Sequence, residues 1–114
     1  MRTRDLKAAA RAAGKAAGIS AASWVEVSET NASAILAGLN DCDPAVYDSL
    51  AFPNLSGEYA DAPTPRSLME DIGLGEDDTR YEWLESDLCD AWENASSRAF
   101  EREVSRRCRY HLST

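Results

Sequence analysis

The stretch TRYEWLESDLCDAWENASSRAF, residues 79–100, decides the fold of this chain. Its apolar residues recur every three or four positions, the spacing that places side chains on one face of an α-helix. That face consists of Tyr81, Leu84, Leu88, Ala91, Trp92, Ala95 and Ala99. Thr79 followed three residues later by Glu82 is a capping-box pattern, so a helix is predicted to begin here.

The apolar pattern continues past Ser97 but moves to another side of the helix. The later set consists of Phe100, Val104, Cys108 and Leu112. On a straight helical wheel this set does not line up with the first one. Two explanations stay open: the helix bends near Asn94–Ser97, or its second half packs against a different neighbour.

A second amphipathic helix is predicted at the N-terminus. One face consists of Leu6, Ala10, Ala13, Ala17, Ala21 and Trp24, and the opposite face of Arg4, Lys7, Arg11 and Lys15. The small residues of the first face allow a neighbouring helix to pack closely. Gly14 and Gly18 each weaken a helix by about 1 kcal/mol relative to Ala. A break near Gly18 is therefore one expectation, with a restart at the capping-box pattern Ser23–Glu26 as the alternative.

Three short helices are predicted between the two long ones, because cap residues and prolines recur before short apolar groups. The start signals are Thr30 or Asn31, Asp43 before Pro44, and Thr64 before Pro65. The apolar residues of the first helix are Ile35, Leu36 and Leu39, and those of the third are Leu68, Met69 and Ile72. Val46, Tyr47 and Leu50 are the expected buried side of the second. Gly73 is a stop signal for the last of them.

The fold predicted from these elements is all-α. The chain has 114 residues, which suits one domain, and no segment alternates apolar and polar residues as a half-buried strand does. Residues 51–64 contain prolines and a glycine that break regular structure. We therefore expect one domain over residues 1–114: a bundle of four to five helices with a long C-terminal helix and one ordered Pro/Gly loop.

The charge is concentrated in the middle of the chain. The net charge is −8, but residues 26–93 carry 17 acidic side chains and only two basic ones, whereas both ends are net basic. An acidic surface repels phosphate and attracts basic surfaces. We therefore expect no direct contact with nucleic acid and a basic protein as partner.

The candidate partner-binding residues are acidic residues of segment 76–93 and a tryptophan on the same, acidic side of the helix. They are Glu76, Asp77, Asp78, Glu82, Trp83, Glu85, Asp87, Asp90 and Glu93. Most charge runs are solvated faces that also suit the positive end of a helix dipole. The functional interpretation is that carboxylates on a rigid helix imitate a row of phosphates, with Trp83 as the apolar anchor.

Two other charge and ligand patterns have plainer interpretations. The basic stripe of the N-terminal helix is expected to lie beside an acidic helix, with nucleic acid or a membrane surface as alternatives. Cys42, Cys89, Cys108 and His111 could form a zinc site on paper, but structural zinc sites contain two close ligand pairs and this chain has one. No metal or cofactor is predicted, and Cys89 and Cys108 are interpreted as small core residues.

Little in the sequence points to catalysis. Glu58 and Asp61 on the Pro/Gly loop are the one carboxylate pair suited to acid–base chemistry, and a solvated loop explains them better. No catalytic residue is predicted. No apolar run reaches the roughly 18 residues of a membrane-spanning helix, so a cytoplasmic protein without a membrane contact is expected.

Three segments resemble a known group of proteins: AASW (21–24), DPAVYDSL (43–50) and PNLSGEYADAPTPRSL (53–68). They are similar to small acidic proteins carried by phages and plasmids of high-GC Gram-positive, actinobacterial hosts. The resemblance covers roughly residues 15–110, and the loop is its most specific part, with Tyr59 where Trp is common. It implies a mobile element in a bacterial cytoplasm, and no mechanism.

Two functions are compatible with these observations. The first is a binding protein that occludes a basic host protein by charge mimicry, such as a nucleic-acid enzyme of host defence or transcription. The second is an assembly protein that forms a homodimer through its Ala-rich N-terminal helix. An exposed Trp83 in a continuous acidic surface favours the first, and a buried Trp83 with a concentration-dependent dimer favours the second.

Overall fold

The computed structural model describes residues 3–43, 46, 50, 62–75 and 77–113. Helices α1 (Thr3–Ala22), α2 (Ala32–Asn40), α4 (Pro65–Asp71) and α5 (Tyr81–Ser113) make up its regular structure, and these described residues contain no strand. The predicted all-α fold with a long C-terminal helix is confirmed. Most of the predicted helix at residues 43–50, with Tyr47, and residues 51–61 of the predicted loop lie outside the described residues.

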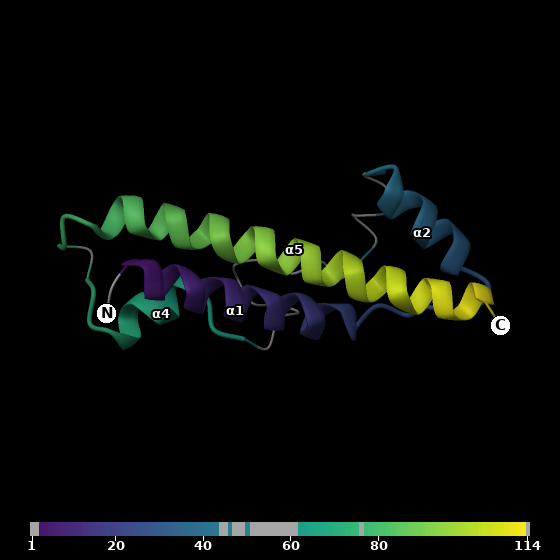
Figure 1. Cartoon of the computed structure of the whole chain (residues 1–114), viewed down its shortest axis with the longest axis horizontal. Helices are drawn as coiled ribbons and strands as arrows, with labels where there is room; N and C mark the ends of the chain where they lie inside the picture. The colour runs from purple at the N-terminus through teal and green to yellow at the C-terminus, as the bar shows by residue number, and fades with distance from the viewer. Residues whose placement is uncertain (1–2, 44–45, 47–49, 51–61, 76, 114) are drawn as a thin grey trace.

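Helices α1 and α5 run side by side and in the same direction, and they form the long axis of the molecule (Figure 1). Backbone atoms of Trp92 lie beside Gly14, and those of Ser96 lie beside Gly18, so residue numbers increase together along the two helices. Helix α4 packs near the start of this pair and α2 near its end (Figure 1). The molecule is elongated, with extents of 53 × 23 × 21 Å.

The contact between α1 and α5 is closest at two glycines, and we call it the α1–α5 seam: Gly14 against Trp92 and Gly18 against Ser96. The predicted buried face of α1 is confirmed from Leu6 to Ala21. No break occurs at Gly18. A Cβ atom added to Gly14 would lie 2.4 Å from the Trp92 carbonyl oxygen, and one added to Gly18 would lie 2.3 Å from the Ser96 carbonyl oxygen. The two glycines are therefore required by the close approach of two backbones.

Trp24 is exposed, at 65% of its surface, and the prediction that it belongs to the buried face of α1 is wrong. The helix ends at Ala22, and the Trp24 backbone N–H donates to the Ala21 carbonyl oxygen in the turn that follows. Helical spacing therefore no longer applies at this position. No new helix starts at Ser23, whose hydroxyl donates to the Ser20 carbonyl oxygen of the last turn of α1.

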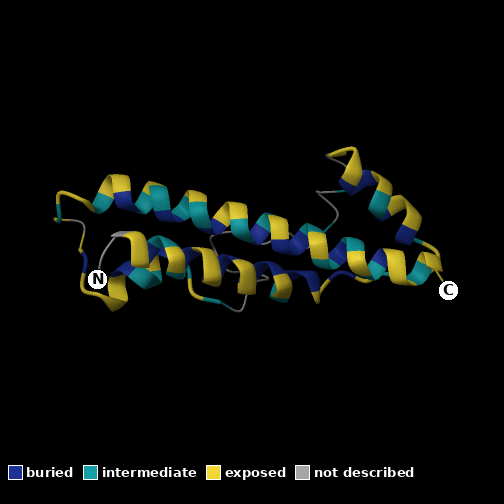
Figure 2. Ribbon diagram, in the orientation of Figure 1, coloured by how far each residue is buried: buried dark blue, intermediate teal, exposed yellow. Residues whose placement is uncertain are grey.

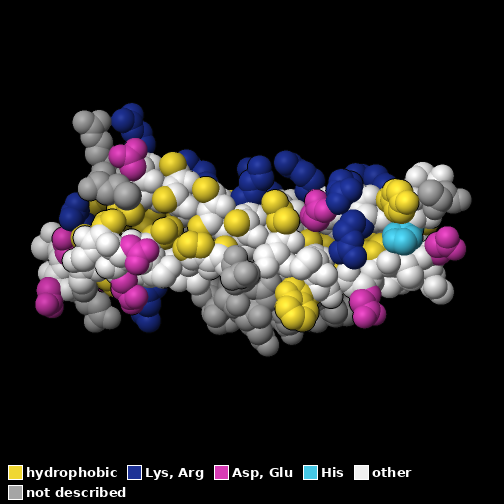
Figure 3. All heavy atoms as spheres, turned by 90° about the horizontal axis from the view of Figure 1, so that it is seen from below, with side chains coloured by type: hydrophobic (Ala, Val, Ile, Leu, Met, Phe, Trp, Pro, Cys, Tyr) yellow, Lys and Arg dark blue, Asp and Glu magenta, His cyan; other side chains and the backbone are white. Residues whose placement is uncertain are grey.

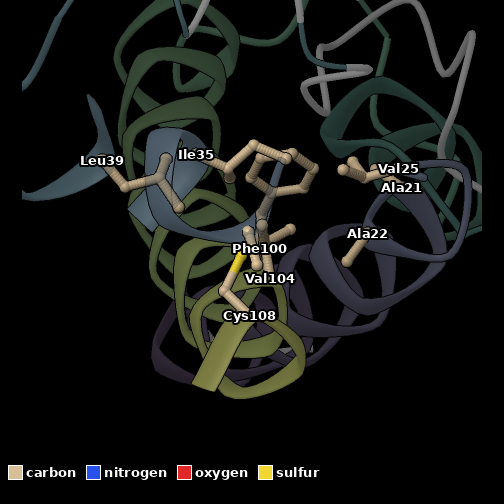
Figure 4. Close-up of a cluster of buried hydrophobic side chains, with 9 residues drawn as sticks. Ala21, Ala22, Val25, Ile35, Leu39, Phe100, Val104 and Cys108 are labelled. Atoms are coloured by element: carbon tan, nitrogen blue, oxygen red, sulfur yellow. The ribbon is translucent and has the colours of Figure 1, made fainter. Parts of the chain in front are cut away.

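Helix α5 continues without interruption for 33 residues. Of the two explanations for its change of apolar face, the second is correct, because its second half packs against α2 and the end of α1 (Figure 4). We call this contact the Phe100 cluster. Its buried members are Ala21, Ala22, Val25, Ala32, Ile35, Leu39, Phe100, Val104 and Cys108. Leu112 was grouped with them by spacing, but it is 49% exposed because it lies one turn beyond the last cluster member.

A third apolar group closes the other end of the molecule, where α4 meets α1 and α5. Met69 and Leu74 are buried there with Leu6, Leu84 and Leu88. Figure 2 shows the buried positions following the inner sides of the paired helices along their length. The Ile72 side chain, at the end of α4, is 39% exposed.

The predicted start and stop of α4 are confirmed in atomic detail. The Thr64 Oγ1 atom accepts from the Ser67 backbone N–H, and the Ser67 Oγ atom accepts from the Thr64 backbone N–H. Gly73 follows the helix with a φ of 75°, and the Leu74 N–H donates to the Met69 carbonyl oxygen. This is the Schellman arrangement, in which glycine supplies the left-handed residue. It turns the chain so that Leu74 becomes buried beside Met69.

Helix α2 begins after Asn31, as predicted, but the Asn31 side chain does not cap it. The side-chain amide bridges the preceding loop instead, accepting from the Ser28 N–H at 2.8 Å and donating to the Glu26 carbonyl oxygen at 2.9 Å. Of the three apolar residues named for this helix, Ile35 and Leu39 are buried and Leu36 is half-buried.

Candidate functional site

The first half of α5 holds six of the nine predicted partner-binding residues, those from Glu82 to Glu93, on a firmly packed helix. Leu84, Leu88 and Trp92 are buried on its inner side. The Trp92 indole N–H donates to the Pro63 carbonyl oxygen at 2.9 Å, which ties the segment before α4 to this helix. Trp83 points away from this packing, and 48% of its surface is exposed. A large apolar side chain is thereby presented to solvent by a rigid support.

The start of α5 is organised by Asp78 and Arg80 rather than by the predicted Thr79–Glu82 capping box. The Asp78 Oδ1 atom accepts from the Arg80 backbone N–H at 2.8 Å, and Asp78 Oδ2 accepts from the Arg80 guanidinium at 3.0 Å. The hydrogen bonds from Arg80 lower the pKa of the Asp78 carboxyl group. The Asp78 charge is therefore already paired within the chain.

Two further carboxylates of the predicted set contact neighbouring side chains. Asp87 Oδ2 lies 3.4 Å from the Lys7 Nζ atom of α1. Partial removal from water raises the pKa of the Tyr81 hydroxyl, and the hydrogen bond and charge of Glu85 raise it further. The expectation that the basic stripe of α1 lies beside an acidic helix is thus confirmed at Lys7.

The remaining described carboxylates of the predicted set are Asp77, Glu82, Asp90 and Glu93, and all four are exposed. Within the described part of the chain they form no ion pair. Glu82 and Glu93 share one side of α5, but Asp90 is turned from Glu82 by about 80° and lies nearer Trp83. The carboxylates therefore fan around the exposed side of α5 instead of forming a single row. Glu76 lies outside the described residues.

The three cysteines differ in how far they are exposed to solvent. Cys42 is exposed, Cys89 is half-buried and Cys108 is buried. Burial raises the pKa of the Cys108 thiol, and burial followed by the nearby charges of Glu85, Glu93 and Asp90 raises that of Cys89. Both thiols are therefore held protonated, which weakens them as nucleophiles and metal ligands. In the described part of the chain no three His, Cys, Asp or Glu side chains gather as a metal site requires. Glu58 and Asp61 lie outside it.

Arg107 has a role that the sequence did not reveal. Its guanidinium donates to the carbonyl oxygens of Ala22 at 2.6 Å and of Val25 at 2.8 Å. Arg107 thus supplies hydrogen bonds and positive charge to carbonyl oxygens at the C-terminal end of α1, whose own last turn contains no basic residue. By position alone, Arg106, Arg107 and Arg109 would suit the negative C-terminal end of α5 itself. Arg106 instead pairs with Glu103, and its hydrogen bonds lower the pKa of that carboxyl group.

A second charged feature lies along the outer edge of the α1–α5 contact. Two adjoining hollows of about 300 and 250 Å³ follow the two helices. Their lining residues are Lys7, Arg11, Lys15, Asp87, Ala91, Asn94, Ala95, Arg98, Ala99 and Arg102. Figure 3 shows Lys and Arg side chains gathered along the upper edge of the paired helices. Helical spacing predicted the cations of α1, but not that Arg98 and Arg102 lie opposite them.

Comparison of the chain with protein-family models, curated proteins and solved structures gives no significant match. None of the described helices is long and apolar enough to cross a membrane.

Proposed function

We propose that this protein is a non-catalytic binding protein that docks on a basic partner protein through the acidic end of α5. The single observation that carries the proposal is the exposure of Trp83, which leaves 48% of its surface in solvent on a helix whose other side is fully packed. Tryptophan is enriched among the residues that dominate binding energy at protein interfaces. A rigid helix also presents such an anchor at a small entropic cost.

The surroundings of Trp83 suit a basic target. Asp87 and Asp90 lie one and two turns further along the same side of α5, and Glu82 precedes the tryptophan directly. These carboxylates would form a polar rim around the apolar anchor and would steer a basic surface towards it. These carboxylates repel one another in the free protein, and a basic partner would relieve that repulsion by neutralising them.

Occlusion is the mechanism that follows from this surface. A protein that binds nucleic acid carries a basic groove, and an acidic helix with an apolar anchor competes for such a groove without catalysis. A nucleic-acid enzyme of host defence or transcription is the target class that this chemistry favours. The phage or plasmid setting implied by the sequence resemblance fits the same target. Because several carboxylates are already paired, we expect Trp83, Asp90 and Glu93 to contribute more than Asp78.

The test is capture of the partner followed by a direct affinity measurement. Tagged wild-type protein is used to capture proteins from an actinobacterial host lysate, and the basic protein identified is purified and titrated against Trp83→Ala and the triple variant Glu82→Gln, Asp90→Asn, Glu93→Gln. Loss of an interface tryptophan costs about 2 kcal/mol or more, so binding to Trp83→Ala should be at least roughly 30-fold weaker.

The controls are Trp24→Ala, which removes a tryptophan that is more exposed than Trp83, and the pair Glu26→Gln, Glu29→Gln, which removes two exposed carboxylates elsewhere. Both should bind as the wild type does. If Trp83→Ala and the triple variant bind the purified partner as tightly as the wild type, the acidic end of α5 is not the binding surface.

Self-association through α1 is a second candidate that one observation favours. The predicted alanine face is covered by α5, but Ala8, Ala12 and Ala16 form another small-residue line on the exposed side of α1, close to Ile19. Small residues let two helices approach closely. Sedimentation of the wild type and of Ala12→Glu tests this candidate: a dimer that the charged variant abolishes supports it, and a wild-type monomer at all concentrations contradicts it.

A further inference from the structure

The hollows between α1 and α5 form one cationic groove, independent of the Trp83 surface. One wall consists of Lys7, Arg11 and Lys15, and the other of Arg98 and Arg102. Asp87 stands at one end, where it contacts Lys7. Ala91, Ala95 and Ala99 lie four residues apart between the two walls.

Cations face cations across this groove. Beyond Asp87, no carboxylate lines it, and Arg11, Lys15, Arg98 and Arg102 form no ion pair or hydrogen bond within the described part of the chain. Like charges brought together in this way repel each other and oppose close packing of the helices. The uncompensated charge indicates an anionic ligand.

We propose that this groove binds the phosphate backbone of a nucleic-acid strand, without reading its bases. Residues four apart on a helix are separated by about 6 Å along its axis, comparable with neighbouring phosphates of an extended strand. Two parallel walls with this spacing could hold successive phosphates between them. Three of the four uncompensated cations are arginines, whose planar guanidinium groups bind phosphate oxygens through two hydrogen bonds.

The lining of the groove favours phosphate over other anionic partners. An acidic helix would need apolar surface to pack against, but Ala91 and Ala95 are already half-buried and Ala99 is buried. A second copy of the groove would bring the same positive charge and would be repelled. No aromatic residue lines the groove, so bases have no side chain on which to stack, and binding should be independent of sequence.

The net negative charge of the whole chain repels nucleic acid, but this repulsion is weak at the groove. Glu93, the nearest carboxylate of the predicted acidic set, precedes Arg98 by five residues and Arg102 by nine, roughly 8 and 14 Å along the axis of α5, and it lies about 140° and 180° around the helix from them. The screening length is about 10 Å at 0.1 M salt. The groove can therefore act as a local basic surface, and we expect affinity that is modest and falls steeply with salt.

The experiment is fluorescence anisotropy with a labelled 20-nucleotide oligo-dT and a 20-base-pair duplex at 20–200 mM NaCl. The test variant is the pair Arg98→Gln, Arg102→Gln. The matched control is Arg106→Gln, Arg109→Gln, which makes the same change in charge on the same helix outside the groove. Each phosphate contact on a single strand contributes about 0.7 to the log–log salt slope. We expect a slope of roughly −2.8 for the wild type and roughly −1.4 for the test variant.

At 50 mM NaCl the test variant should bind the oligonucleotide at least roughly tenfold more weakly, while the control stays within twofold of the wild type. Equal helicity of all variants by circular dichroism shows that folding is preserved. Three results would overturn the proposal: no binding by the wild type at the lowest salt, equal weakening in test and control variants, or tighter groove-dependent binding of polyglutamate than of the oligonucleotide. Trp83→Ala should bind the oligonucleotide normally, so this test and that of the proposed function can fail separately.

Discussion

Helix α5 makes two contacts that depend on opposite properties of its neighbours. Along the α1–α5 seam, backbone atoms of Trp92 and Ser96 come so close to Gly14 and Gly18 that no side-chain atom fits there. In the Phe100 cluster, the space between α5 and α2 is filled by bulky side chains. The seam therefore depends on side chains that are missing, and the cluster on side chains that are present. Adding atoms should damage the first, and removing atoms should damage the second.

The largest effect is expected from Phe100→Ala, because Phe100 is fully buried at the centre of its cluster. Loss of a buried phenylalanine costs about 3–5 kcal/mol in unfolding free energy. Urea unfolding followed by circular dichroism measures this loss. The control Leu112→Ala removes an exposed side chain from the same helix and should change stability by less than about 0.5 kcal/mol. A loss below about 1 kcal/mol for Phe100→Ala would contradict the role of the cluster.

The seam is tested by adding a single methyl group. Gly14→Ala improves helix propensity by about 1 kcal/mol, yet the new Cβ meets a backbone oxygen that cannot rotate away. Overpacking of this kind costs about 1–3 kcal/mol or more, and we expect a net loss of about 2 kcal/mol. Gly75→Ala is the matched control, since nothing lies within 4 Å of its added Cβ. A stabilised Gly14→Ala protein would show that the helices are not in backbone contact.

Arg107 fastens the end of α1 to α5 beside the Phe100 cluster, because both of its acceptors, Ala22 and Val25, belong to that cluster. Arg107→Met keeps much of the side-chain length but removes the hydrogen bonds to Ala22 and Val25. Hydrogen bonds from a charged group contribute about 1.5–3 kcal/mol. Because Arg107 is partly exposed, we expect the free energy of unfolding to fall by about 1.5 kcal/mol. The same change at exposed Arg109 serves as the control. Equal thermal stability of the two variants would mean that the end of α1 needs no partner.

The smallest effect concerns pH and the buried thiol of the cluster. Burial raises the pKa of Cys108 above the ordinary value of 9.0. The folded state therefore holds its proton at pH values where the unfolded state loses it, so this contribution to stability is complete below pH 9 and is lost as the pH rises further. Unfolding curves at pH 8 and 10 should show a decline that Cys108→Ala reduces. Cys42→Ala, at an exposed thiol, should leave the decline unchanged.

Helical periodicity predicted most of the core, because it depends only on which residues of one helix share a side. It placed Leu84, Leu88 and Trp92 inward and Trp83 outward, as observed. It misplaced Trp24 because the helix ended two residues earlier, and a wheel carries no information about the end of a helix without a clear stop signal. It also treated Gly14 and Gly18 as weak points, since propensity cannot reveal a backbone packed against them.

The candidate surface was predicted in part. Trp83 and the exposed carboxylates follow from residue order, but the pairing of Asp87 with Lys7 required the parallel placement of α1 and α5. The same placement set Arg11 and Lys15 opposite Arg98 and Arg102. These residues lie eighty or more positions apart in sequence, and no local sequence pattern links them before the helices are positioned.

The sequence by itself determined which segments are helical, which sides of them are apolar and how the charge is distributed along the chain, because these depend on contacts a few residues apart. Only the tertiary structure decided the parallel direction of α1 and α5, the close approach at Gly14 and Gly18, and the use of Arg107 at the end of a distant helix. These features depend on which surfaces meet in space. That choice is made by packing of the whole molecule, which no local pattern records.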